Sequence, residues 1–363
     1  MPFNRGSLSF TIFEITGELP EDIIELFASR KAEALDAVTA DEQIGWVTGR
    51  HLLDTVIDDA SAQLGGCYYL TLRRAARKIP AALLNALCRR EEQIFMKANE
   101  LEYISAKMRR QIREETTEKY IQKMPPQLAG IPMVLDPASK LLYVGATSRS
   151  QLDLFIDNFY QTLKIEPLQL TPELLLERIL GTTAAGFPVL DLGGQPSPDL
   201  ATGRDFLLYL WYYSETVGKV SGPDEGEFDV LIEGPLVFTG SGEDDGAGEA
   251  QIKKGDNPLH SAEVKAALSV GKKLKKAKLS ITRDNQVWSG TFDADLFAFS
   301  SFSLPESEEM NPEEIFSDRI RDLGVFKSAF SAYFKLFADA MSNGKDAATS
   351  KAIREWISAR EAF

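Results

Sequence analysis

The chain has 363 residues, of which 44% are hydrophobic and 26% charged, and its formal net charge is −14. A chain of this length is expected to form two or three domains with apolar cores. No stretch approaches the ~18 consecutive apolar residues of a membrane-spanning helix, and no apolar run of signal-peptide type follows the first residues, so we expect a cytoplasmic protein. Nucleic-acid binding over the whole surface is excluded by the negative charge, so it would need a confined basic patch.

The first elements are predicted from alternation and capping. Residues 7–12 alternate apolar and polar side chains, which predicts a strand. Pro20 then begins a helix with carboxylates in its first turn. Strands are predicted at residues 45–47 and 67–74, and in the second of these Arg73 and Arg77 would point away from the apolar face. Cys67 and Cys88 lie in apolar contexts and are expected to be reduced core residues.

The middle of the chain reverses the overall charge. Residues 72–123 contain thirteen cations and seven carboxylates, a local charge of +6. Two helical patterns, one from Pro80 to Leu101 and one from Lys107 to Lys123, predict a helical hairpin that projects from a domain. Pro125 and Pro126 end it. A local positive field attracts polyanions even when the whole molecule repels them. Charge alone fits better with solvated helices that are rich in Lys and Arg.

Strands and helices alternate along the rest of the chain. A β-hairpin is predicted at residues 131–147, followed by helices at about 148–163 and 171–180 and a buried aromatic helix at 205–213. Residues 220–250 hold nine carboxylates and no Lys or Arg, with strands at 228–232 and 236–239 and a loop at 240–248. A helix from about residue 261, strands at 272–282 and 287–297, and a last helix from Asn311 complete the chain. This order predicts an α+β fold with several domains.

Few residues suggest catalysis. His51 and His260 are the two histidines, and neither completes a Ser-His-Asp or Cys-His set. No Walker or dinucleotide loop is present. Asp293 with Asp295, and the cluster at residues 243–245, are the carboxylates that could hold Mg²⁺ for a nuclease. Neither has a Glu-x-Lys or His companion, and an acidic hairpin edge and a solvated loop explain them better. We therefore predict no catalytic residue, metal site or cofactor.

Short motifs follow one another in a characteristic order. Gly45-Trp46-Val47 precedes Arg-Lys-Ile-Pro at residues 77–80, the charged hairpin, and then Met-Val-Leu-Asp at residues 133–136 with Leu-Tyr-Val after it. Ala-Gln-Ile-Lys-Lys at residues 250–254 and Gly-Lys-Lys-Leu at residues 271–274 follow later in the chain. This order resembles the recombination-associated RdgC family, whose members are also labelled "putative exonuclease". The resemblance covers most of the chain.

The resemblance implies an architecture and a function. It implies a central α+β domain at residues 1–78 and 126–165, a helical finger or tip at 79–125, and a base α+β domain at 166–363 with an acidic insertion at about 197–248. It also implies a nucleoid-associated protein that binds DNA without strong sequence preference as a ring-shaped homodimer and limits access of the RecA recombinase. The family pattern Leu-Pro-Arg-Ala-Phe is replaced here by Met-Pro-Pro-Gln-Leu at residues 124–128, without its Arg and aromatic residue.

Two sets of residues are predicted to mediate binding. The dimer interface is placed on the phenylalanine stripe of the last helix, and DNA contacts on the basic residues of the finger, the strand before it and the base domain. Alternatives are a metal-dependent exonuclease using Asp293 and Asp295, and a protein-interaction scaffold using the acidic segment 220–250. The interface residues are Phe326, Phe330 and Phe334, and the DNA-contact residues are Arg73, Arg74, Arg77, Lys78, Arg89, Arg90, Lys97, Lys107, Arg109, Arg110, Arg113, Lys119, Lys123, Lys253, Lys254, Lys272, Lys276 and Lys278.

Overall fold

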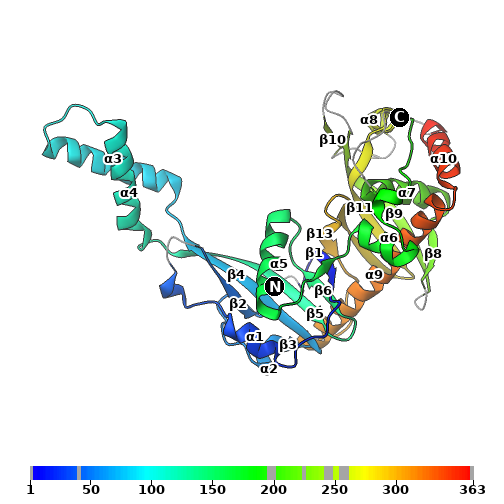
Figure 1. The fold of residues 1–363 in the computed structure, drawn as a ribbon, viewed down its shortest axis with the longest axis horizontal. Coiled ribbons are helices and arrows are strands. Elements are labelled where there is room, and N and C mark those ends of the chain that lie inside the picture. The colour runs from blue at the N-terminus through cyan, green and yellow to red at the C-terminus, as the bar shows by residue number, and fades with distance from the viewer. Residues whose placement is uncertain are drawn as a thin grey trace. The chain divides into compact units, whose positions relative to one another are not determined.

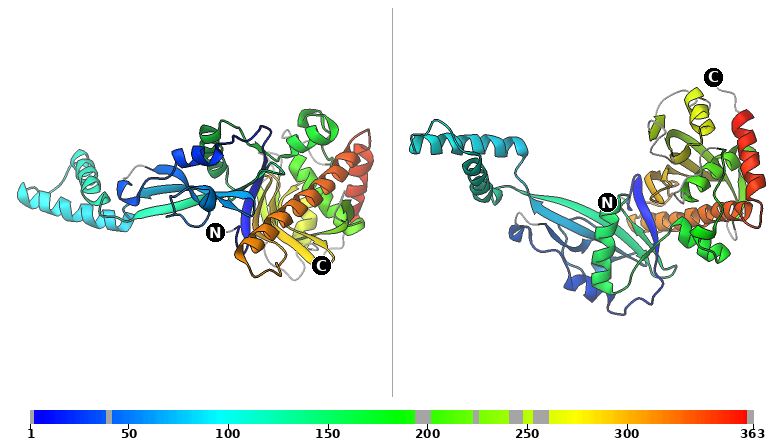
Figure 2. Two further views of the ribbon diagram at one scale, coloured as in Figure 1. Left: turned by 90° about the horizontal axis from the view of Figure 1, so that it is seen from below. Right: turned by 45° about the horizontal axis from the view of Figure 1, so that its top comes forward.

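The computed structural model describes residues 3–38, 42–193, 202–222, 226–240, 248–252 and 261–359. The chain divides into two compact units. Unit 1 comprises Met1–Glu18, Leu64–Tyr68 and Val134–Phe363, and unit 2 comprises Leu19–Gln63 and Tyr69–Met133. Both combine helices with antiparallel strands (Figures 1 and 2), which confirms the α+β prediction. The three-domain boundaries remain a prediction.

The strands of unit 1 form an antiparallel arrangement in the order β10-β9-β11-β12-β13-β1-β6. Small side chains allow close approach where β12 meets β13, as at Gly290, where a Cβ atom would lie 2.8 Å from Phe302 Cα. The strands are β1 (Leu8–Glu14), β6 (Leu141–Val144), β7 (Leu168–Gln169), β8 (Lys219–Gly222), β9 (Gly226–Thr239), β10 (Glu249–Ile252), β11 (Lys273–Arg283), β12 (Gln286–Asp293) and β13 (Ala298–Ser303).

The helices of unit 1 supply the other half of its core. Phenylalanines of α9 contact Phe206 of α7 and phenylalanines of the strands, and Trp288 of β12 donates from Nε1 to the Asp322 carbonyl of α9 at 3.0 Å. Helix α7 is buried along most of its length, as its aromatic sequence predicts. The helices are α5 (Arg149–Leu163), α6 (Pro172–Leu180), α7 (Thr202–Thr216), α8 (Ala262–Ser269), α9 (Pro312–Met341) and α10 (Asp346–Ala359), with a 3₁₀ turn at Ala184–Gly186.

Three C-terminal predictions need correction. The strand predicted at 287–297 ends at Asp293 as β12, and the following turn, in which Phe297 has φ +51°, leads into β13, a separate strand that was not predicted. The two strands predicted within 228–239 form one strand, β9, with a cis peptide between Gly234 and Pro235. Helix α10 was not predicted, although Ile353, Trp356 and Ile357 have helical spacing. The loop predicted at 240–248 lies largely outside the described residues.

Unit 2 consists of a small sheet, short helices and a helical hairpin. β2 (Gln43–Thr48) pairs with β4 (Cys67–Arg77), which neighbours β5 (Pro126–Asp136), while β3 (Gln63–Leu64) also pairs with β4. Phe27 of α1 (Ile23–Ser29) packs edge-on against Trp46 at 4.9 Å. A 3₁₀ turn at Leu35–Ala37 and α2 (Asp59–Ala62) complete the body, and α3 (Ala81–Ala98) and α4 (Ala106–Ile121) join β4 to β5 (Figure 1).

Candidate nucleic-acid interface

The predicted helical hairpin is present as α3 and α4, and we call residues 79–125 the finger. Helix α3 begins directly after Pro80, and α4 begins directly after its N-cap Ser105, whose hydroxyl accepts the N–H of Met108 at 3.2 Å. Four apolar residues of the finger are buried: Cys88, Ile104, Ile112 and Ile121. Such a small core leaves most of the finger surface polar and accessible, as an exposed binding element requires.

Several finger cations are neutralised within the finger. Glu91 accepts from Lys119 at 3.1 Å and from Arg90 at 3.4 Å, and the hydrogen bond from Lys119 is the main reason that its pKa lies below the usual range. Arg109 lies 3.6 Å from Glu92, and Arg110 forms an i,i+4 pair with Glu114 at 3.0 Å. The pairs of Lys119 with Glu91 and of Arg109 with Glu92 join α4 to α3, and all four pairs weaken the field of the cations involved.

Other finger cations have no acidic partner. Arg89, Lys97 and Lys107, together with Lys78 directly before the finger, are exposed, and no ion pair reaches them from the residues that the structure describes. Arg113 donates to the side-chain oxygen of Asn85 at 3.2 Å, and the ammonium of Lys123 lies 4.9 Å from the Tyr120 ring centre. Residues 79–123 hold nine cations and seven carboxylates, so a modest positive charge remains on the finger.

The arginines of β4 have structural contacts. Arg73 is 2% exposed and donates to the carbonyls of Glu33 and Leu52. Arg77 donates to the carbonyl of Val38 at 2.7 Å and to that of Met124. Arg74 forms two hydrogen bonds with Glu42, at 2.7 and 3.0 Å. The strand therefore does not present its arginines on a free surface, contrary to the expected orientation of Arg73 and Arg77.

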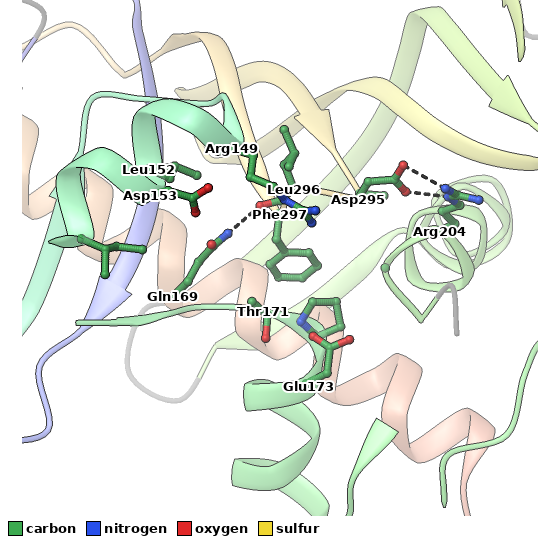
Figure 3. A pocket seen from close by; sticks show the side chains of 14 residues that line it. Arg149, Leu152, Asp153, Gln169, Thr171, Glu173, Arg204, Asp295, Leu296 and Phe297 are labelled. Atoms are coloured by element: carbon green, nitrogen blue, oxygen red, sulfur yellow. Dashed lines mark hydrogen bonds and ion pairs between the residues drawn. The ribbon is translucent and has the colours of Figure 1, made fainter. Parts of the chain in front are cut away.

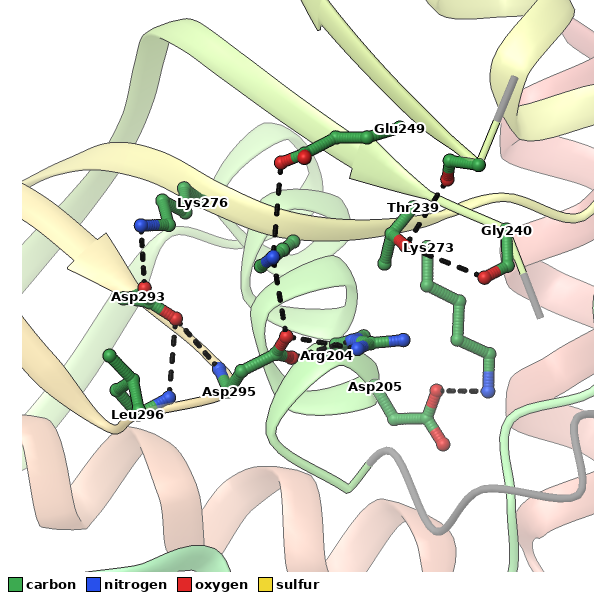
Figure 4. A network of polar contacts seen from close by, with 12 residues as sticks. Arg204, Asp205, Thr239, Gly240, Glu249, Lys273, Lys276, Asp293, Asp295 and Leu296 are labelled. Atoms are coloured by element: carbon green, nitrogen blue, oxygen red, sulfur yellow. Dashed lines mark hydrogen bonds and ion pairs between the residues drawn. The ribbon is translucent and has the colours of Figure 1, made fainter. Parts of the chain in front are cut away.

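The lysines of β11 are also matched by carboxylates. Lys276 lies 2.7 Å from Asp293, and Lys278 lies 2.8 Å from Glu233 (Figure 4 shows the first pair). Lys272 is half-buried and engaged in an interaction of its own. Lys253 and Lys254 lie outside the described residues. The basic strand predicted in the base domain thus has much less free positive charge than its sequence suggests.

The two carboxylates considered for a nuclease are already occupied. Asp293 Oδ1 accepts the N–H groups of Asp295 at 3.0 Å and Leu296 at 3.2 Å, while Oδ2 pairs with Lys276. Asp295 accepts two hydrogen bonds from Arg204, at 2.6 and 2.9 Å (Figure 4). Within the described ranges, no group of three or more His, Cys, Asp or Glu side chains is placed to hold a metal ion. Residues 243–245 lie outside those ranges.

A pocket of about 450 Å³ lies beside the turn between β12 and β13, which contains Asp295 and Leu296 (Figure 3). The first residues of α5, α6 and α7 surround it, with Arg149, Glu173 and Arg204 in its wall, and Gln169 donates to the Leu296 carbonyl at 2.7 Å. Since Arg204 is paired with Asp295, one of the two arginines of this pocket is already neutralised.

The phenylalanine stripe of α9 is internal. Phe326, Phe330 and Phe334 are each 0% exposed. Phe330 lies 5.2 Å from the rings of both Phe292 and Phe299. The stripe therefore packs on its own unit and has no surface left for a dimer interface. Periodicity indicated an apolar face but could not indicate which surface covers it.

The remaining single residues have local roles. His51 Nδ1 accepts the N–H of Leu53 at 3.2 Å. Cys67 and Cys88 are buried and free of disulfides, as predicted, and burial raises the pKa of the Cys67 thiol to about 12. None of the helices that the structure describes is long and apolar enough to cross a membrane.

The fold and the finger define an α+β protein with a mixed-charge helical hairpin inserted between two strands of an antiparallel sheet. A family model described as "RdgC: Putative exonuclease, RdgC" matches residues 9–177, from β1 into α6, and so includes the whole finger. This region belongs to the recombination-associated RdgC family, which confirms the resemblance there. A comparison with curated proteins finds no match.

Proposed function

We propose that this protein acts in DNA recombination by binding DNA through the finger, with contacts to phosphates and little sequence preference. The observation that carries the proposal is the difference between the two basic segments. Arg89, Lys97 and Lys107 on the finger, and Lys78 directly before it, are exposed without acidic partners among the described residues, whereas Lys276 and Lys278 of β11 each face a carboxylate. Phosphates bind free cations most readily, because a paired cation must first give up its partner.

The net charge of −14 supports a confined contact. Apart from the finger, the protein repels a polyanion, so a duplex would approach the surface where cations outnumber carboxylates. Phosphate contacts position a protein on DNA but carry no sequence information. Weak sequence preference and strong salt dependence would follow from this mode of binding.

The test removes three free cations of the finger. We expect Arg89→Ala with Lys97→Ala and Lys107→Ala to weaken binding to unrelated duplexes almost equally. If all three contact phosphates, the slope of log K against log salt shrinks by roughly 2–3. The assay is fluorescence anisotropy with labelled duplexes at several salt concentrations.

The matched control removes three exposed lysines from α9 to α10, Lys335, Lys345 and Lys351, by substitution with alanine. It changes the net charge equally, so it should leave the salt slope unchanged. A triple finger variant with the wild-type slope would contradict the proposal. An equal loss in both triple variants would show that only the total charge matters.

On the family resemblance, we also propose a ring-shaped homodimer that limits RecA access to DNA. The buried phenylalanines of α9 are not part of this proposal's interface. Light scattering at micromolar concentration tests the dimer, and a monomer there would contradict it. RecA filament assembly on DNA coated with the protein tests the antagonism, which should be weaker for the triple finger variant than for the control.

A further inference from the structure

An acidic groove of about 760 Å³ lies in unit 1, outside the region that matches the family. The start of β12, the end of β13 and residues 304–309 before α9 form its walls, and the first part of α9 forms its floor. The groove shares no residue with the finger. The class of ligand that fits this groove must therefore be inferred from the residues that line the groove.

Carboxylates dominate this groove. Its lining carboxylates are Glu306, Glu308, Glu309, Asp318 and Asp322, against one lining cation, Arg321. Arg321 pairs with Asp318 Oδ1 at 2.9 Å, and the Ser307 hydroxyl donates to Asp318 Oδ2 at 2.6 Å. Repulsion from Glu314 is the main cause of a raised pKa at Glu309. The groove therefore has an excess of negative charge that its own arginine does not balance.

Asp322 distinguishes this groove from an ordinary acidic surface. The residue is 5% exposed, and its backbone carbonyl accepts from Trp288. Among the residues that the structure describes, none donates a hydrogen bond to its carboxylate or lies within ion-pair distance of it. Burial raises the pKa of this carboxyl group. Attraction from Arg321, Arg283 and Arg319 opposes that rise, but none of the three lies within ion-pair distance of the carboxylate. Since polar groups with so little exposure usually have a direct partner, this carboxylate in the groove lining is open to an external one.

The volume of the groove and the arrangement of its side chains indicate which class of ligand Asp322 would bind. Within the described ranges, no three carboxylate, His or Cys side chains are grouped to hold a metal ion. The volume of the groove lies in the range of organic-ligand sites. At its edge Val287 is 46% exposed, which provides an apolar contact for the aliphatic stem of a long cationic side chain.

We propose that this groove binds an arginine side chain from a basic segment of a partner protein, with the guanidinium on Asp322. A guanidinium can donate two parallel hydrogen bonds to one carboxylate, which an ammonium cannot do. The surrounding carboxylates attract a segment with further cations, and they repel nucleic acid. This site is independent of DNA binding by the finger.

The test uses the full-length protein and a fluorescein-labelled peptide with alternating arginine and glycine residues. Anisotropy titrations compare the wild type with Asp322→Asn, which keeps the shape of the side chain. We expect about tenfold weaker binding, since one charge-assisted hydrogen-bonded pair is lost. The matched control is Glu355→Gln on α10, an exposed site with the same change of charge, which should bind within twofold of the wild type.

A second variant keeps the test valid if Asp322→Asn fails to fold. Glu306→Gln with Glu308→Gln alters exposed groove residues only and should also weaken binding more than Glu355→Gln does. No peptide binding by the wild type, or equal weakening by the groove and control variants, would overturn the proposal. Calorimetry could also overturn the proposal. It would do so if the wild type bound calcium and Asp322→Asn abolished calcium binding but kept peptide binding. Peptide binding that disappears as the protein self-associates would show that a second copy occupies the groove, and would also overturn it.

Discussion

A buried ion pair between α7 and β11 gives the sharpest stability prediction. Asp205 is 1% exposed and Lys273 is 8% exposed, and Asp205 Oδ1 lies 2.5 Å from Lys273 Nζ (Figure 4). Asp205 Oδ2 accepts the N–H of Leu190 at 3.0 Å. Burial raises the pKa of Asp205 even though Lys273 opposes that shift. The lysine is thus the main group that makes an ionised carboxylate tolerable at this position.

Replacing Lys273 by methionine removes the charge but keeps most of the side-chain volume. The carboxylate of Asp205 is then buried without a cation, which costs about 3–5 kcal/mol of folding stability at neutral pH. That is a large fraction of the ~5–15 kcal/mol that stabilises a typical domain. Replacing both partners, as Asp205→Asn with Lys273→Met, should recover most of the loss, because the amide oxygen can still accept from Leu190.

The loss should depend on pH. In Lys273→Met the pKa of Asp205 is raised in the folded state above its unfolded value, so protonation favours folding. The variant is therefore closest to the wild type in acid and falls behind as the pH rises through the folded pKa. Urea unfolding, followed by the fluorescence of the buried Trp211 and Trp288, measures the free energy of unfolding at each pH.

The control is Lys219→Met, which breaks an exposed pair with Glu227 and should leave the urea midpoint nearly unchanged. If Lys273→Met were no less stable than this control at neutral pH, the buried pair would not hold Asp205 as argued. If the double variant were as unstable as Lys273→Met, lost packing and not an unpaired charge would be the cause.

Three further changes test the core and the carboxylate pair. Phe330→Ala should cost about 3–5 kcal/mol in urea unfolding without changing the mass measured by light scattering, because the ring packs only within its own unit. Gly290→Ala should cost about 1–3 kcal/mol in the same assay, since the new Cβ would lie 2.8 Å from Phe302 Cα. Asp293→Asn with Asp295→Asn should leave finger-dependent DNA binding intact, and no Mg²⁺-dependent loss of labelled DNA ends is expected before or after the change. Metal-dependent degradation that this double change abolishes would favour the exonuclease alternative.

Local chemistry made much of the fold predictable. Thr171 accepts from the N–H of Leu174 at 3.3 Å, and Asn311 accepts from that of Glu313 at 3.0 Å, so both caps begin helices where their sequences indicate. The finger helices and the buried aromatic helix α7 follow from apolar spacing alone. These features depend on residues a few positions apart, and the sequence shows such residues directly.

Tertiary contacts decided which charged and aromatic residues are available. Arg73 donates to a carbonyl 40 residues away, and Lys278 lies 2.8 Å from Glu233, which is 45 residues away in the sequence. The sequence shows a basic strand in both places, but only the pairing of distant segments shows that its charges are already used. The same holds for Phe330, whose apolar face was evident while its covering surface was not. Composition and periodicity determined the elements of this protein, and long-range packing determined which side chains were left to bind a partner, because burial and ion pairing depend on what folds against each element.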